Sequence, residues 1–217
     1  MSHIFASRKL ADFIKDLKLD YVQYETPAYW HIGALYTNVV LQAGLNYSTV
    51  VRPRVSRVLT KYPEAATVHG FLHLIDEIGL EIMINWRHQE KIRRIYDVLE
   101  FSQEHTINTC VDLAKFLIVP ANRERYLEIK GFGAKTLDYT LKLLNFDTIA
   151  VDRHLYSFIK LAGLEINDYQ SAKKIVEFAS DLLAVPRASI DYSIWLYMSN
   201  KSSRDSAGNQ SQLYLGF

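Results

Sequence analysis

Apolar side chains recur along this chain at the spacing of helices. In residues 6–19, Leu10, Phe13, Ile14 and Leu17 are three or four positions apart and form a single apolar stripe. No segment shows the period of two that is typical of a half-buried strand. The pattern therefore predicts an all-α protein, with further helices over residues 29–44, 48–61, 67–78, 86–101, 109–117, 152–161, 168–183 and 189–198.

A glycine-containing turn separates two more helical segments at residues 130–133, Lys-Gly-Phe-Gly. Gly131 and Gly133 allow positive φ angles and leave backbone N–H groups uncovered. A helix is predicted to begin near Ala134, so the positive end of its dipole lies at the same place. The turn is therefore suited to hold an anion such as a phosphate.

Length, composition and cysteine content limit the classes of protein to which this chain can belong. At 217 residues, with 49% hydrophobic and 23% charged residues, the chain fits one globular domain or two small lobes. Cys110 is the only cysteine, which excludes an internal disulfide and a cysteine-ligated metal or iron–sulfur cluster. No signal-peptide core and no apolar run of about 18 residues is present. A cytoplasmic protein is expected, with residues 200–212, rich in Ser, Asn and Gln, predicted to be loose.

The net charge of +1 argues neither for nor against a polyanionic partner, so local clusters of charge must be considered. Basic residues recur on two predicted helices near Tyr and Trp residues. Each group is either a DNA-facing patch or an ordinary solvated helix face. The groups are Arg52, Arg54, Arg57 and Lys61, and Arg87, Lys91, Arg93 and Arg94.

Two side chains after the glycine turn are candidates for chemistry. Lys135 lies in the first turn of a predicted helix, whose dipole opposes its charge and favours the neutral amine that forms a Schiff base. Asp152 immediately precedes the next helix, and an ionised carboxylate beside a sugar can stabilise oxocarbenium-like charge. The plainer alternatives are a solvated lysine and an N-cap aspartate.

The order of these residues resembles the helix-hairpin-helix DNA glycosylase superfamily, which contains endonuclease III. Its members look like L-P-G-V-G-x-K-T-A, followed by a helix and a V-D-x-H stretch. The matching residues here are 129–136 and 151–154. Residues 40–43 are similar to the family's L-S-x-Q-[AT] segment and residues 79–91 to its G-[FY]-x-x-x-K-A-x-x-[IL] region, so the resemblance covers roughly residues 30–165.

The resemblance implies a two-lobed all-α fold with the active site in the cleft between the lobes. One lobe would be a helical bundle of residues 28–134, and the other would combine residues 1–27 with 148–217. The helix-hairpin-helix segment, residues 126–147, would join them. The partner would be damaged double-stranded DNA, bound by a monomer that is associated with the nucleoid and not with a membrane.

The implied reaction is that of a bifunctional DNA glycosylase and abasic-site lyase in base excision repair. Lys135 would be the nucleophile that displaces the damaged base and then forms a Schiff base. Asp152 would help to activate Lys135 and stabilise the charged sugar, and His154 would orient Asp152 or simply pack. Gln42 would fill the space left by the flipped nucleotide, or is a polar residue at a helix end.

The hairpin would bind the DNA backbone independently of sequence, through main-chain amides at residues 130–133. Lys130, Gly131, Phe132 and Gly133 are therefore expected to be DNA-binding residues, and such hairpins often share a monovalent cation with the phosphate. Lys130 replaces the proline usual in the family and adds a positive charge beside the phosphate.

The sequence does not identify the base that would be excised. The absence of the four-cysteine cluster and the D-R-H sequence look closest to small archaeal-type 8-oxoguanine glycosylases, which favours an oxidised base, either 8-oxoguanine or an oxidised pyrimidine. Those proteins tend to have K-G-x-G-x-K-E-A, whereas this chain has Lys135-Thr136-Leu137. The alternatives are a monofunctional glycosylase for uracil, mismatched or alkylated bases, and a non-catalytic DNA-binding module.

Overall fold

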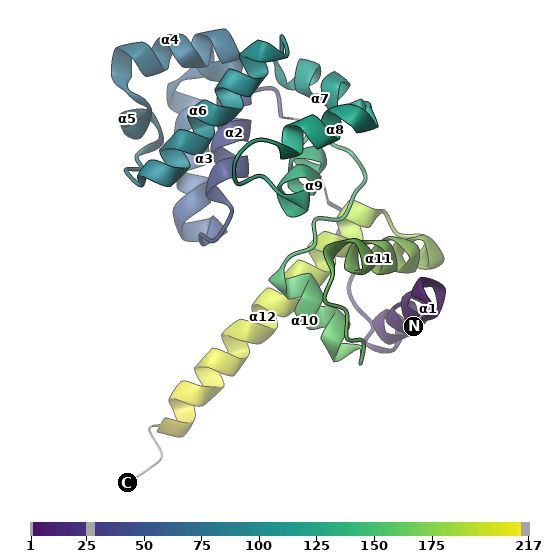
Figure 1. The fold of residues 1–217 in the computed structure, drawn as a ribbon. Coiled ribbons are helices and arrows are strands. Elements are labelled where there is room, and N and C mark those ends of the chain that lie inside the picture. Colours follow the sequence, from purple (N-terminus) through teal and green to yellow (C-terminus); the bar gives the residue numbers. More distant parts are fainter. Residues whose placement is uncertain (1, 25–28, 214–217) are drawn as a thin grey trace. The chain divides into compact units, whose positions relative to one another are not determined.

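The structure is a computed structural model that describes residues 2–24 and 29–213, with side chains up to Lys201 (Figure 1). Every regular element in these residues is a helix, which confirms the all-α prediction for this part of the chain. The α-helices are α1 His3–Asp16, α2 Ile32–Leu41, α3 Arg52–Lys61, α4 Val68–Ile78, α5 Leu80–Ile84, α6 Gln89–Glu104, α7 Cys110–Ile118, α8 Pro120–Leu127, α9 Ala134–Leu143, α10 Arg153–Leu161, α11 Tyr169–Leu183 and α12 Arg187–Leu213. A π-helix, η1 Tyr47–Val51, and a 3₁₀-helix, η2 Pro63–Ala66, complete the set.

The chain divides into two compact units, each with its own hydrophobic core. Unit 1 consists of Met1–Glu25 and Asp147–Phe217, and unit 2 of Thr26–Phe146. The segment 126–147, predicted to connect two lobes, falls within unit 2 except for its last residue. The lobe boundary predicted at residues 27 and 28 lies outside the described residues.

Unit 2 is built around α2, all of whose residues are buried. The helix is apolar on nearly every side, and such a helix is stable only when other helices surround it. It packs against α3, α4, α6 and α9. Its polar side chains are satisfied: Thr37 donates to the Gly33 carbonyl at 2.7 Å, and Asn38 donates to the Tyr29 hydroxyl at 2.9 Å.

Unit 1 joins the first helix to the last three. Helix α1 packs against α11, and α12 packs against α10 and α11 (Figure 1). Small residues at the contact, including Ala6, Ala11, Ala172 and Ala179, are almost completely buried and allow the helices to approach closely. The loop of residues 21–24 is held on α12 by its backbone, because Val22 and Tyr24 donate to the hydroxyls of Ser193 and Ser189.

The predicted helix over residues 48–61 has a different local structure. Residues Tyr47–Val51 form a single π turn, and α3 begins only at Arg52. Pro53 lies in the first turn of α3, where its missing N–H leaves no hydrogen bond unmade. Helix α5, which the periodicity did not predict, is bounded by the positive φ angles of Gly79 and Asn85 and is too short to give a periodic signal.

The prediction of a loose tail at residues 200–212 was wrong, because α12 continues to Leu213. The first half of this helix is anchored by the buried side chains of Ile190, Ile194 and Met198. Once a helix is nucleated, each further residue adds a hydrogen bond at little cost, so it can propagate through a polar sequence. Within the described ranges, no helix is both long and apolar enough to cross a membrane.

The start of α2 contains a buried histidine whose two ring nitrogens have different roles. His31 is the N-cap residue: its Nδ1 accepts the N–H of Ala34 at 3.1 Å, and its Nε2 lies 2.9 Å from the Tyr62 carbonyl, to which it donates. Burial lowers the pKa of His31, and the hydrogen bond to Tyr62 only partly opposes this. A proton added at Nδ1 would also face the N–H of Ala34.

Acid is therefore expected to destabilise unit 2 through His31. Because the folded pKa is depressed, the unfolded chain binds more protons below pH ~6.5, and stability falls as the pH drops, by at most about 1.4 kcal/mol per pH unit for one group. Urea unfolding at several pH values would measure this slope. His31→Asn, which keeps a capping side chain, should flatten it. His69→Asn, at an exposed histidine of α4, should not, and equal slopes for both variants would contradict the assignment.

Candidate functional site

The hairpin between α8 and α9 is pinned by its apolar side chains. Ile129 and Phe132 are both buried, and the Phe132 ring packs edge-on against the buried Tyr126 with 5.1 Å between centroids. The Phe132 N–H donates to the Ile129 carbonyl at 2.9 Å. Phe132 therefore holds the turn together, and neither its N–H nor its ring is free to contact a ligand.

The remaining amides of the turn are available. Gly133 is the N-cap of α9, and the Leu137 N–H donates to its carbonyl at 3.0 Å. Within the described residues, the N–H groups of Gly131, Gly133 and residues 134–136 have no acceptor. A Cβ added at Gly133 would have no atom within 4 Å, so the space over the turn is open. These are the features of an anion site at a helix N-terminus.

Two features favour glycine at position 131. Its φ angle is +84°, which side chains other than glycine rarely adopt. An added Cβ would also lie 2.5 Å from Nε and 2.6 Å from Cζ of Arg94. Glu90, one turn earlier on α6, forms an ion pair with Arg94 and holds the guanidinium in this place. Arg94 thus places a positive charge directly against the hairpin.

Substitution of Gly131 is therefore expected to be costly. Gly131→Ala introduces backbone strain and should reduce the free energy of unfolding by roughly 1–3 kcal/mol, whereas the flexible end of the Arg94 side chain can move aside at a small cost. Gly133→Ala is the matched control: its φ of −132° suits alanine, and the loss should stay below about 1 kcal/mol, the preference of an N-cap for glycine over alanine. Urea denaturation measures both, and equal losses would show that the backbone conformation at residue 131 does not require glycine.

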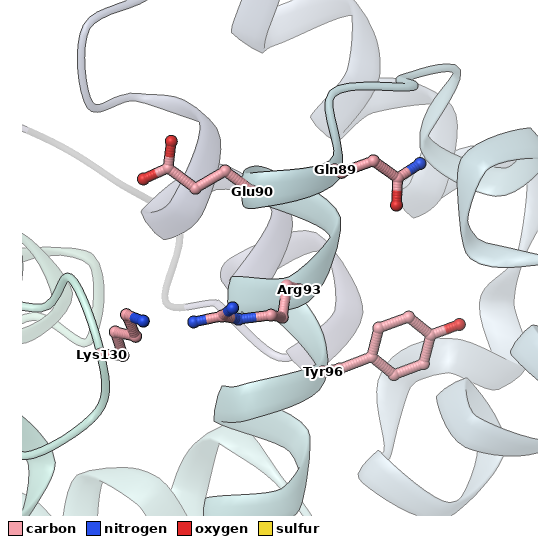
Figure 2. Close-up of a pocket in the computed structure, with 5 residues that line it drawn as sticks. All are labelled: Gln89, Glu90, Arg93, Tyr96 and Lys130. Carbon is pink, nitrogen blue, oxygen red and sulfur yellow. The ribbon is translucent and has the colours of Figure 1, made fainter.

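An open groove of about 650 Å³ lies between α6 and the hairpin loop. It is lined by Gln89, Glu90, Arg93, Tyr96 and Lys130. Figure 2 shows Lys130 and Arg93 extending toward one another from the two sides of this groove. Lys130, which the resemblance led us to expect beside a phosphate, is exposed and has no ion pair or hydrogen-bond partner in the described part of the chain.

Lys135 and Asp152 belong to different units. Lys135 lies in the first turn of α9 in unit 2, and its side chain is half-buried. Asp152 is the N-cap of α10 in unit 1, where Oδ1 accepts the N–H groups of His154 at 2.8 Å and Leu155 at 3.1 Å. Oδ1 of Asp152 therefore has the N-cap role that was the plainer interpretation of this residue. Its second oxygen, Oδ2, accepts no hydrogen bond from the described residues.

In unit 1, the rings of His154, Trp195, Tyr192 and Tyr24 lie next to one another in a row. The His154 ring lies 6.3 Å from the Trp195 ring, and the Trp195 ring is parallel to that of Tyr192, with 6.0 Å between centroids. Tyr24 continues the row at 5.5 Å from Tyr192. His154, Tyr192 and Trp195 are half-buried, so part of each ring faces solvent. Nothing in the sequence indicated the pairing of Trp195 with Tyr192.

Gln42 is the C-cap residue of α2, and its Nε2 is buried without a hydrogen-bond partner among the described residues. A buried amide without an acceptor costs free energy unless a ligand or water satisfies it. The adjacent turn is held by Lys91, whose Nζ donates to the carbonyls of Val40 at 2.8 Å and Ala43 at 2.9 Å. Burial, with the nearby charge of Arg94, lowers the pKa of Lys91.

Several residues of the two basic groups serve the fold. Arg54 donates to the carbonyls of Asn85 and Val50, and its guanidinium lies 4.8 Å from the centre of the Trp86 ring. Arg57 donates to the carbonyls of Met83 and Ile82, which end α5. Together with Lys91, these side chains complete helix ends. Arg93, Arg94 and Lys130 remain as the cations gathered at the hairpin.

Among the described residues, no group of three or more His, Cys, Asp or Glu side chains could hold a metal ion. Burial raises the pKa of the Cys110 thiol to about 12, which makes it a poor nucleophile. In comparisons with known proteins, no family model matches this sequence, and no solved structure gives a significant match.

Proposed function

We propose that this chain is a bifunctional DNA glycosylase and abasic-site lyase that excises an oxidised base from duplex DNA. The observation that carries the proposal is the hairpin, which presents unbonded amides to solvent and is followed at once by Lys135 in the first turn of α9. A backbone phosphate held by those amides would bring a sugar of the same strand toward the lysine. The proposal extends the resemblance of residues 129–136 and 151–154 to the superfamily of endonuclease III.

The reaction begins with the target nucleotide flipped out of the duplex, at a cost of a few kcal/mol that is smallest for a damaged base. The neutral amine of Lys135 attacks C1′, and the glycosidic C–N bond breaks. The electron pair of that bond leaves with the base, which takes up a proton. The sugar ring then opens to give a protonated Schiff base, and loss of a proton from C2′ expels the 3′ phosphate.

Asp152 would act on the same nucleotide through Oδ2, while Oδ1 caps α10. Two backbone N–H groups hold Oδ1 in its capping position. A fixed negative charge can stabilise positive charge on the sugar as the glycosidic bond breaks. The parallel rings of Tyr192 and Trp195, in the same unit as Asp152, are suited to stack against an extrahelical base.

The proposal is tested with the wild-type chain and a panel of duplexes that each carry one lesion: 8-oxoguanine, an oxidised pyrimidine, uracil or an alkylated base. Borohydride reduces a Schiff base to a stable amine, so a covalent complex with an oxidised-base duplex is expected. Release of base without a trapped complex would identify the monofunctional alternative, in which Oδ2 of Asp152 directs a water molecule. Binding with no base release from any duplex would identify a non-catalytic module.

A further inference from the structure

The α6 side of the hairpin adds two arginines to Lys130 of the hairpin itself. Arg93 and Arg94 are neighbours on α6, and residues one apart on a helix point in different directions. Arg94 lies against Gly131, whereas Arg93 lines the groove opposite Lys130. The two side chains therefore bring charge to both sides of the hairpin loop.

The charges at this place are only partly neutralised. Glu90, which also lines the groove, pairs with Arg94 and orients its guanidinium against Gly131. The ion pair of Arg93 with Asp97 is long, with 3.9 Å between Nε and Oδ2. Arg93 and Lys130 face one another across open space (Figure 2). Like charges held close together repel, and an anion bound between them relieves that repulsion.

The rest of the groove suits the sugar–phosphate backbone. Tyr96 is 41% exposed and offers a ring for contact with a deoxyribose, and Gln89 offers an amide that can donate to a phosphate oxygen. A guanidinium forms charge-assisted, often bidentate hydrogen bonds with phosphate. None of these side chains would report the identity of a base, so the contact would be independent of sequence.

We propose that the groove formed by Gln89, Glu90, Arg93, Tyr96 and Lys130, with Arg94 at its edge, binds a second phosphate of the DNA strand that is held at the hairpin. The proposal rests on the proposed DNA-binding function and adds a contact that the hairpin alone does not provide. Arg94 links the two subsites, because it contacts Gly131 on one side and pairs with Glu90 of the groove on the other. The strand would therefore follow the N-terminal half of α6.

The test is the salt dependence of binding to a short undamaged duplex, followed by fluorescence anisotropy with the full chain. Each lost phosphate contact reduces the slope of log affinity against log salt concentration by about 1. Arg93→Ala and Arg94→Ala should each show this change, with affinity lowered several-fold and equally for unrelated sequences. Arg93→Lys, which keeps the charge, should restore the wild-type slope.

Two exposed cations of unit 2 serve as controls. Arg125→Ala, on α8, and Lys115→Ala, on α7, remove one charge each without touching the groove. Their slopes should equal that of the wild type. Wild-type slopes for Arg93→Ala and Arg94→Ala, or equal reductions in the controls, would overturn the proposal. Circular dichroism confirms that each variant is folded.

The salt dependence of DNA binding is measured independently of base release and Schiff-base formation. Binding to undamaged DNA needs neither base release nor a Schiff base, so the groove can pass its test even if no duplex of the lesion panel yields a trapped complex. Conversely, trapping that depends on Lys135 would support the proposed function even if the salt slope of Arg93→Ala equals that of the wild type.

Discussion

Replacing Lys135 by alanine is expected to abolish the borohydride-trapped complex and to slow base release by roughly 10³-fold or more. Only an amine can form the Schiff base that borohydride reduces. Alanine in the first turn of α9 is a good helix former, and the lysine side chain is only half-buried, so the variant should fold. Denaturing gel electrophoresis after reduction measures trapping, and release of the base is followed separately.

A second variant separates the nucleophile from a phosphate-binding lysine. Lys135→Arg keeps the positive charge at the N-terminus of α9, but a guanidinium stays protonated and cannot attack C1′. It should bind DNA about as well as the wild type and form no trapped complex. Lys115→Ala, at an exposed lysine of the same unit, should trap normally. Trapping by Lys135→Ala would show that another amine is the nucleophile.

Replacing Asp152 by asparagine is expected to reduce base release by about 10²- to 10⁴-fold without unfolding unit 1. Asparagine caps a helix about as well as aspartate, since its side-chain oxygen can still accept the N–H groups of His154 and Leu155. What disappears is the negative charge. Binding to undamaged DNA should persist or become tighter, because a carboxylate repels the phosphate backbone. Single-turnover base release and anisotropy measure the two effects.

A second aspartate of unit 1 provides the matched control. Asp168 caps α11 by accepting the Ser171 N–H at 2.7 Å. Asp168→Asn makes the same chemical change at a helix start and should leave base release unchanged. Asp152→Ala should lose about 1 kcal/mol of stability in addition to its activity, because the cap is removed. Full activity of Asp152→Asn would show that Asp152 caps α10 and has no part in base release.

Part of the candidate site could be predicted because its determinants are local. The turn at Gly131 follows from the φ freedom of glycine, and the cap at Asp152 from a side chain that reaches N–H groups two and three residues later. The helices follow from apolar positions three or four residues apart. The short helix α5, the π turn before α3 and the continuation of α12 were missed, since each depends on flanking structure and not on its own periodicity.

The rest of the candidate site and of the fold depends on contacts between residues far apart in the chain. No spacing rule links Arg94 to Gly131, His31 to the Tyr62 carbonyl, or Lys91 to the end of α2. From the sequence, Lys91, Arg93 and Arg94 were members of one basic group on one helix. Folding divides them, because adjacent residues of a helix face different neighbours: Lys91 closes a helix end, Arg94 packs on a glycine, and Arg93 faces an open groove.

The sequence by itself determined the helical class, the hairpin and the candidates Lys135 and Asp152, because helix periodicity, glycine turns and caps involve residues within a few positions of one another. Only the tertiary structure decided which amides and cations remain free for a ligand. That distribution depends on which carbonyls and carboxylates the packed helices bring to each side chain. Lys91 is used to close the end of α2, while the amide of Gly131 is left open beside Arg94.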